Sequence, residues 1–276
     1  SNSSTSYLNA TGKIDYGLTN DFMFRAILQN NHNVLKGLIC ALLHLKLEEM
    51  KEIIIRNPIN LGENIEDKEF ILDIEVMLNH NTLINLEMQV TNKLNWPERS
   101  LSYLCRLYDQ LHSGQEYKEA LPVMHICFLD FSLFEDHLEF YGIYKLLNIK
   151  DHYLYSDKLA LGVVDLTHIE LATQEDKDFQ IDHWARLFKA TTWEEIKMIA
   201  SDNQYLSEAT QVLYEYNADK IIRQKCQARE ENERYERMVK RIMQEQADAL
   251  VEKDATIAAK DAELAEKDAL IAKLLQ

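Results

Sequence analysis

The sequence predicts an α/β protein in which a mixed central β-sheet is flanked by helices and followed by an all-α C-terminal region. Three observations carry this prediction. Apolar residues recur at helical spacing near the N-terminus, alternate with polar residues in two neighbouring segments, and return to helical spacing from Phe179 onward. Between these regions helices and strands alternate without the regular rhythm of a doubly wound parallel sheet, which favours a mixed sheet.

The N-terminal part predicts helices and then a strand. Thr19-Asn20-Asp21 supplies capping residues ahead of an apolar stripe that continues to Leu43. The polar tract 30–33 predicts a kink or a break into two helices. The next segment, 52–58 (EIIIRNP), is rich in β-branched residues and stops at proline, which predicts a strand.

Two segments with strict alternation, 68–78 and 82–90, predict a β-hairpin, because the Asn-His-Asn tract between them favours a turn. A three-residue loop places Asp73 opposite Glu87, and a five-residue loop places Asp73 opposite Gln89 instead. Since strand side chains alternate between faces, either register gathers these polar side chains on one face of the hairpin. A two-residue loop would separate the two acids.

The remaining elements follow from apolar spacing and from turn residues. A helix is predicted over 97–113, with proline in its first turn and Gly114 as its terminator. Strands are predicted at 121–131, 138–147 and 159–171, and helices at 179–190, at 192–200 and in one run from Leu206 to the end. The expected organisation is a flexible arm (1–17), a sheet domain (18–175), a helical subdomain (176–225) and a long helix (226–276).

Composition limits the functional classes. Asp and Glu number 46 against 30 Lys and Arg, for a net charge of −16, which excludes a protein that coats nucleic acid through bulk charge. Four widely spaced cysteines without a C-x-x-C pair are typical of reduced, buried thiols. The longest apolar stretch, 37–45, is half a membrane span, and the polar start lacks a signal-peptide pattern, although processing of the start could have removed one. We therefore expect a cytoplasmic protein with no membrane partner.

The C-terminal helix carries a seven-residue repeat. Leu250, Ile257, Leu264 and Ile271 recur every seven residues, which is typical of a left-handed supercoil. Alanines fill a neighbouring 3-4 spacing, and alanine buries little area. Two interpretations stay open: a helical pairing, which would make a homo-oligomer if it joins two chains, and a solvated single helix.

Asp73 and Glu87 are the candidates for a metal site. Opposed carboxylates flanked by apolar residues repel each other unless a divalent cation lies between them, and Mg²⁺ favours one or two carboxylates plus water and substrate phosphate. Alternatively, the two acids line the solvated face of a half-buried hairpin. In the following helix, Arg99, Tyr103 and Arg106 share one face, which is either a surface that holds phosphate and stacks on a base or sugar, or a solvated polar face.

Several motifs in this order resemble the PD-(D/E)XK nuclease superfamily, and more closely its transposase-like, recombination-promoting branch. The resemblance covers roughly residues 18–171, and the helical second half is similar to the same branch. The motifs are Thr19-Asn20-Asp21-Phe22, Leu72-Asp73-Ile74, Leu86-Glu87-Met88-Gln89, Arg99-Ser100-Leu101-x-Tyr103 and Gly114-x-x-Tyr117.

The resemblance implies a restriction-endonuclease-like sheet with the metal site at a splayed hairpin. It implies that Asp73 and Glu87 bind Mg²⁺, with Mn²⁺ as a substitute and the Met88 carbonyl as a third ligand. Asp21 is either an additional acid of the site or a helix cap. Gln89 stands where the superfamily usually has Lys, and an amide orients water without lending it positive charge, so catalysis would depend more on the metal.

Two functions follow from these expectations. The first is a metal-dependent DNA endonuclease linked to transposition or recombination, with Asp73, Glu87 and Gln89 as its catalytic residues. The second is a catalytically inactive, nuclease-like interaction protein that assembles through its helical tail.

Overall fold

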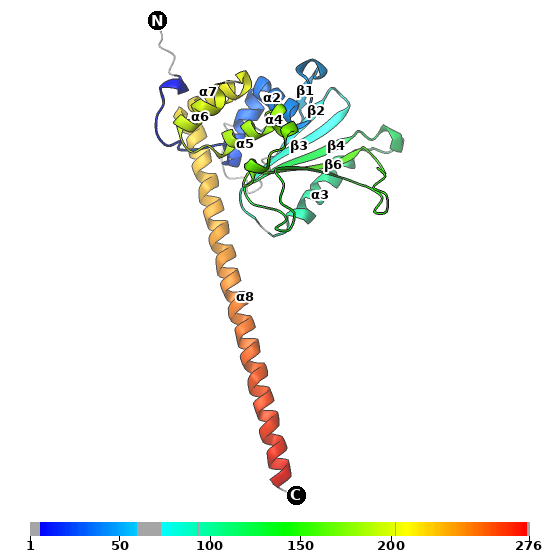
Figure 1. Ribbon diagram of the computed structural model, residues 1–276, viewed down its shortest axis with the longest axis vertical. Coiled ribbons are helices and arrows are strands. Elements are labelled where there is room, and N and C mark those ends of the chain that lie inside the picture. Colours follow the sequence, from blue (N-terminus) through cyan, green and yellow to red (C-terminus); the bar gives the residue numbers. More distant parts are fainter. Residues whose placement is uncertain (1–5, 60–72, 93, 202, 275–276) are drawn as a thin grey trace. The chain divides into compact units, whose positions relative to one another are not determined.

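The computed structural model describes residues 6–59, 73–92, 94–201 and 203–274. Within these ranges the chain forms a six-stranded mixed sheet flanked by helices, and it ends in a long helix, α8 (Lys220–Leu274) (Figure 1). This arrangement confirms the predicted α/β, restriction-endonuclease-like fold. The chain divides into two compact units, residues 1–229 and 230–276.

The sheet has the strand order β1-β2-β3-β4-β6-β5 in the described residues. The first three strands pair antiparallel, β3, β4 and β6 pair parallel, and β5 closes one edge antiparallel to β6. The strands are β1 (Ile53–Ile55), β2 (Ile74–Leu78), β3 (Thr82–Gln89), β4 (Val123–Leu129), β5 (Tyr141–Lys145) and β6 (Leu159–Asp165). All six were predicted as strands, although residues 68–72 of the first hairpin segment lie outside the described residues.

The last predicted strand is shorter than expected. It ends at Asp165, and residues 169–171 form a 3-10 turn rather than a continuation of the strand. The Asp165 carboxylate accepts hydrogen bonds from the backbone N–H of Thr167 at 2.8 Å and from its hydroxyl at 2.5 Å. This local bond turns the chain out of the sheet, because a short acidic side chain competes with the ladder for backbone donors.

One face of the sheet packs against most of the helices (Figure 1). The rings of Phe24, Phe128 and Phe188 meet edge-on at centroid distances of 5.1–5.6 Å, which joins α1, β4 and α5. The helices on this side are α1 (Asp21–Asn30), α2 (His32–Leu42), α4 (Gln174–Asp178), α5 (Ile181–Lys189), α6 (Trp193–Ala200) and α7 (Gln204–Ala218). The predicted break near residues 30–33 is confirmed, since α1 ends at Asn30 and α2 begins at His32.

The opposite face carries α3 (Trp96–Tyr108), which links the parallel strands β3 and β4 (Figure 1). Such a crossover is needed because parallel neighbours cannot be joined by a tight turn. Trp96 and Leu104 pack on this face of the sheet. The helix ends at Tyr108 rather than at the predicted residue 113, because the backbone of Asp109 leaves the helical region (φ −77°, ψ 69°), although its N–H still makes the last helical bond, to the Cys105 carbonyl at 2.9 Å.

The predicted single helical run from Leu206 to the C-terminus is wrong, because two helices, α7 and α8, meet at Asp219. This residue has an extended backbone (φ −77°, ψ 123°), and its carboxylate accepts a hydrogen bond from the Ile222 N–H at 2.9 Å. Aspartate satisfies free N–H groups at a helix start and is a weak helix former in the interior, so it breaks the run.

The structure also bears on the expected burial of the cysteines and on the expected absence of a membrane span. Cys127 and Cys226 are buried and Cys40 is half-buried, but Cys105 is exposed on the outer side of α3, so the prediction of four buried thiols is wrong at that position. Over the described residues, no helix combines the length and the apolar composition needed to cross a membrane.

The second unit, described to Leu274, is the remainder of α8. The heptad residues Leu250, Ile257, Leu264 and Ile271 have exposed fractions between 53% and 60%. Ion pairs four residues apart, such as Lys267–Glu263, follow its surface and support an isolated helix.

Candidate functional site

The hairpin register decides which residues face each other. Ile74 pairs with Leu86 and Leu78 with Thr82, which leaves the three-residue loop 79–81 and confirms that alternative. Continuing the register by one residue places Asp73, directly before β2, opposite Glu87. Side chains of directly opposed residues share one face, with Cβ atoms about 4.5–5.5 Å apart. The hairpin therefore brings the two predicted carboxylates together on the α3 face of the sheet.

Glu87 is held from α3 by an arginine. The Arg99 guanidinium donates to the Glu87 Oε1 at 2.8 Å and to the Gln89 Oε1 at 3.2 Å. Its carbon lies 5.3 Å from the ring centroids of both Trp96 and Tyr103, a cation–π arrangement that fixes the guanidinium in place. The Glu87 side chain is only 9% exposed, whereas that of Arg99 is 29% exposed.

A fully buried histidine completes the other side of Glu87. His125, on β4, lies beside Asn85 in the parallel register, and the Asn85 Nδ2 contacts the His125 Nδ1 at 3.1 Å. Burial, with the charge of Arg99 as a smaller cause, lowers the pKa of His125 to about 4, so the ring is neutral at pH 7. An amide nitrogen only donates, so Nδ1 accepts and Nε2 carries the proton, 3.7 Å from the Glu87 Oε2.

Asp73 lies in an environment that favours its protonated form. Burial raises the pKa of this carboxyl, while the Asn85 amide and the charges of Arg25 and Arg99 oppose that rise. Among the described residues, the Asp73 Oδ1 is buried and has no hydrogen-bond partner, and the same holds for the Asn85 Oδ1. The site therefore presents oxygen atoms whose hydrogen-bonding capacity is not used within the described chain.

Arg25, buried in α1, anchors the start of β2. Its guanidinium donates to the backbone carbonyls of Asp73 and Asn57 and to the Gln29 Oε1 at 3.0 Å. The Asn57 side chain adds a bond from its Nδ2 to the Asp73 carbonyl at 3.1 Å and accepts from the Glu75 N–H at 2.8 Å. Burial lowers the pKa of Arg25 to about 10, so this arginine stays charged at pH 7.

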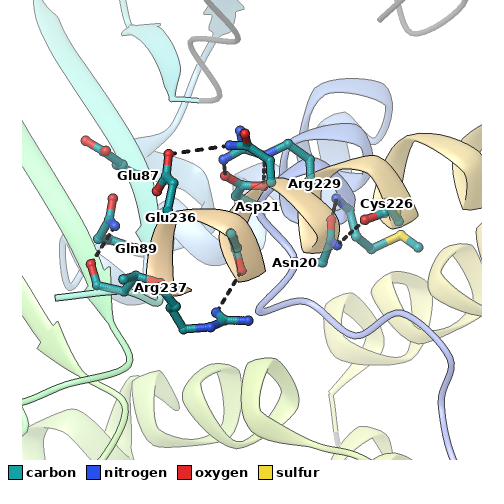
Figure 2. A network of polar contacts seen from close by, with 12 residues as sticks. Asn20, Asp21, Glu87, Gln89, Cys226, Arg229, Glu236 and Arg237 are labelled. Carbon is teal, nitrogen blue, oxygen red and sulfur yellow. Dashed lines mark hydrogen bonds and ion pairs between the residues drawn. The ribbon is translucent and has the colours of Figure 1, made fainter. Parts of the chain in front are cut away.

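Asp21 is paired at the start of α1 (Figure 2). Asn20, not Asp21, caps the helix, since its side chain accepts from the Met23 N–H at 3.2 Å. Both carboxylate oxygens of Asp21 accept from Arg229, one of them at 2.9 Å, and the Asn20 Nδ2 donates to the Cys226 carbonyl at 3.0 Å. The capping alternative for Asp21 is therefore wrong, and its role as an additional acid of the site stays a prediction.

The three predicted substrate-contacting residues of α3 separate into two groups. Arg99 and Tyr103 face the site, and the Tyr103 ring lies 5.9 Å from the ring of His125. Arg106 is exposed, and among the described residues no hydrogen bond or ion pair involves it. Gln89 is fixed at both ends of its amide, since its Nε2 donates to the Thr91 carbonyl at 2.8 Å (Figure 2).

The donors suit a hydrated divalent ion better than a closed metal site. No group of three or more His, Cys, Asp or Glu side chains in the described residues is arranged to hold a metal. The candidate metal ligands are therefore the pair of carboxylates, of which Asp73 has one oxygen without a hydrogen-bond partner in the described chain. Mg²⁺ is compatible with such a pair because it keeps several waters, whereas a structural zinc site needs four protein ligands.

Sequence reasoning missed Arg25, Asn85 and His125. Each carried a signal: Arg25 interrupts the apolar run FMFRAIL, Asn85 continues the alternation with Glu87 and Gln89, and His125 is the one imidazole within the apolar segment LPVMHICFL. A polar residue at a buried position needs a partner, and that requirement marks such residues as parts of a network.

Comparison with known proteins agrees with this geometry. Residues 18–242 match a family described as PD-(D/E)XK nuclease family transposase. Searches of curated proteins and of solved structures found no significant match. The family match covers the sheet, the acid pair and α3, and it suggests a nuclease or transposition-related function. The chain belongs to the PD-(D/E)XK nuclease family of transposases.

Proposed function

We propose that this protein is a metal-dependent DNA endonuclease that acts in transposition or recombination. The observation that carries the proposal is the placement of Asp73 opposite Glu87, with Gln89 two residues further on the same face, in a chain of this family. The carboxylate pair would bind Mg²⁺, with Mn²⁺ as a substitute and the Met88 carbonyl as a further ligand. A divalent ion there would lower the pKa of a bound water and neutralise charge on the phosphate.

Other side chains would orient the attacking water and contact the DNA. Gln89, whose amide nitrogen is held by the Thr91 carbonyl, would orient the attacking water. Arg99, Tyr103 and the exposed Arg106 would contact the DNA backbone and sugar. A net charge of −16 requires these contacts to be local, because the protein as a whole repels a polyanion.

A plasmid-nicking assay tests the proposal. We expect supercoiled plasmid to be nicked in Mg²⁺ and to stay intact in EDTA. Replacing Asp73→Asn should lower the nicking rate at least about 100-fold, because the metal supplies several kcal/mol of transition-state stabilisation. Glu75→Gln is the matched control: Glu75 lies two residues further along the chain, in β2, where it is opposite Asn85 and pairs with Arg56 at 3.4 Å instead of facing Glu87, so the rate of this variant should stay near that of the native protein.

The same assay separates the rival function. Plasmid that stays intact at every Mg²⁺ and Mn²⁺ concentration would contradict the endonuclease and favour a nuclease-like interaction protein. Two features make this rival worth testing: Gln89 lacks the charge of a lysine, and Arg99 is bonded to Glu87.

We also propose that two copies associate through the C-terminal helix. Substituting Ile257→Gln and Leu264→Gln together should abolish any concentration-dependent rise in mass, measured by light scattering after size exclusion, because both heptad residues are exposed in the single chain. Glu252→Gln with Glu266→Gln changes the other side of the helix and should leave the mass unchanged. A native protein that stays monomeric at all concentrations would contradict the pairing.

A further inference from the structure

The guanidinium of Arg99 lies next to Glu87 and supplies the positive charge that balances this buried carboxylate. It donates to the Glu87 Oε1 at 2.8 Å, and the same guanidinium donates to Gln89 at 3.2 Å. One of the two proposed metal ligands is therefore already matched by a charged side chain of the protein. A second cation at the same carboxylate would meet a like charge at close range in a poorly solvated site, where Coulomb interactions are strong.

Arg99 is also placed where an incoming ligand can reach it. Its side chain is 29% exposed, although that of its partner Glu87 is 9% exposed. On α3 the guanidinium is flanked by the rings of Trp96 and Tyr103, whose centroids each lie 5.3 Å from its carbon atom. A planar guanidinium binds phosphate as well as carboxylate in a bidentate way, so a phosphodiester is a chemically matched competitor for this residue.

We propose that Arg99 is a built-in competitor of the divalent cation for Glu87, and that a polyanionic backbone which draws the guanidinium away releases the carboxylate for the cation. The inference rests on the proposed function and adds an order of events to it. In the free protein the cation binds weakly, because Arg99 holds Glu87. With a phosphodiester bound, cation binding strengthens, and by reciprocity the cation strengthens phosphodiester binding.

A purely positioning role for Arg99 predicts the opposite behaviour. If the arginine only orients Glu87 for the cation, its removal lets the carboxylate rotate and weakens cation binding. The sign of the change in cation affinity therefore distinguishes competition from positioning.

The test measures Mn²⁺ affinity by titration calorimetry without DNA, on the full chain. We expect Arg99→Gln to bind Mn²⁺ about 5- to 150-fold more tightly than the native protein, the usual range for coupling between two ligands. Arg99→Lys keeps the charge and should stay close to the native affinity. Arg106→Gln removes one charge from an exposed position of the same helix and should change the affinity little.

The outcomes separate the inference from the function on which it rests. Equal or weaker Mn²⁺ binding by Arg99→Gln, with native binding lost in Asp73→Asn, overturns the competition and leaves the metal site in place. An affinity that is the same in the native protein, Arg99→Gln and Asp73→Asn overturns the metal site itself. Circular dichroism and a thermal melt of each variant identify any that fails to fold, and in that case Arg99→Met, which keeps the aliphatic stem, replaces Arg99→Gln.

Discussion

Arg25→Met should lower the free energy of unfolding by about 3–5 kcal/mol, the largest loss that we expect from a single substitution in this network. Arg25 is fully buried, and its guanidinium satisfies the carbonyls of Asp73 and Asn57 and the Gln29 side chain. Methionine fills part of the volume but donates nothing, so these buried acceptors lose a charged donor. Urea denaturation followed by circular dichroism measures the change.

The loss of Arg25 should also disturb the candidate site, because Arg25 bonds to the backbone carbonyl of Asp73 and so holds its carboxylate in place. Arg56→Met is the control: Arg56 pairs with Glu75 at 3.4 Å and its side chain is 44% exposed, so its loss should cost less than about 1 kcal/mol. If the two variants lost equal stability, the buried network around Arg25 would not be a determinant of the fold.

The second large effect that we expect is a loss of folding stability at low pH. We expect the native protein to lose about 3 kcal/mol through His125 alone as the pH falls from 6.5 to 4. The pKa of His125 is lowered from 6.5 to about 4, first by burial and then by Arg99, so the unfolded chain takes up the proton before the folded protein does. The stability that depends on a neutral ring is therefore complete above pH 6.5 and decreases as the pH approaches 4.

A variant isolates this contribution. Asp73 acts in the opposite direction, because a carboxyl whose pKa is raised in the folded state adds stability as the pH falls. The comparison is therefore the unfolding free energy as a function of pH in the native protein and in His125→Gln. Between pH 6.5 and 4 the variant should lose about 3 kcal/mol less stability than the native protein, so its slope should be flatter. His137→Gln removes an imidazole whose side chain is 68% exposed and should retain the native slope. Identical slopes in the native protein and His125→Gln would contradict the prediction.

The hairpin shows how much local pattern determines. Alternation along 82–89 sufficed to place Glu87 and Gln89 on one face, since side chains in a strand switch sides at every residue, and a loop of three or five residues adds Asp73 to that face. The pattern left the loop length open, and the observed pairing of Ile74 with Leu86 selected the three-residue loop. Register depends on how the turn closes, which alternation does not encode.

The helical half shows the limit of the same reasoning. Apolar spacing from Leu206 onward indicated one helix, but Asp219 divides it, because a capping bond to the Ile222 N–H outweighs continued helical spacing. The length of α3 was likewise overestimated, since the helix ends where the backbone of Asp109 leaves the helical region (φ −77°, ψ 69°) and not at Gly114.

The sequence by itself determined the fold class, the order of the strands along the chain, the break after α1 and the common face of Glu87 and Gln89, because each depends on residues that are neighbours in the chain. Only the tertiary structure decided that Arg99 bonds to Glu87, that Arg25 anchors Asp73 and that His125 is buried and neutral beside them. These contacts join elements that are distant in sequence, and they form only where α1 and α3 pack against opposite faces of one sheet. Their charge balance, and with it the chemistry open to the acid pair, follows from that packing.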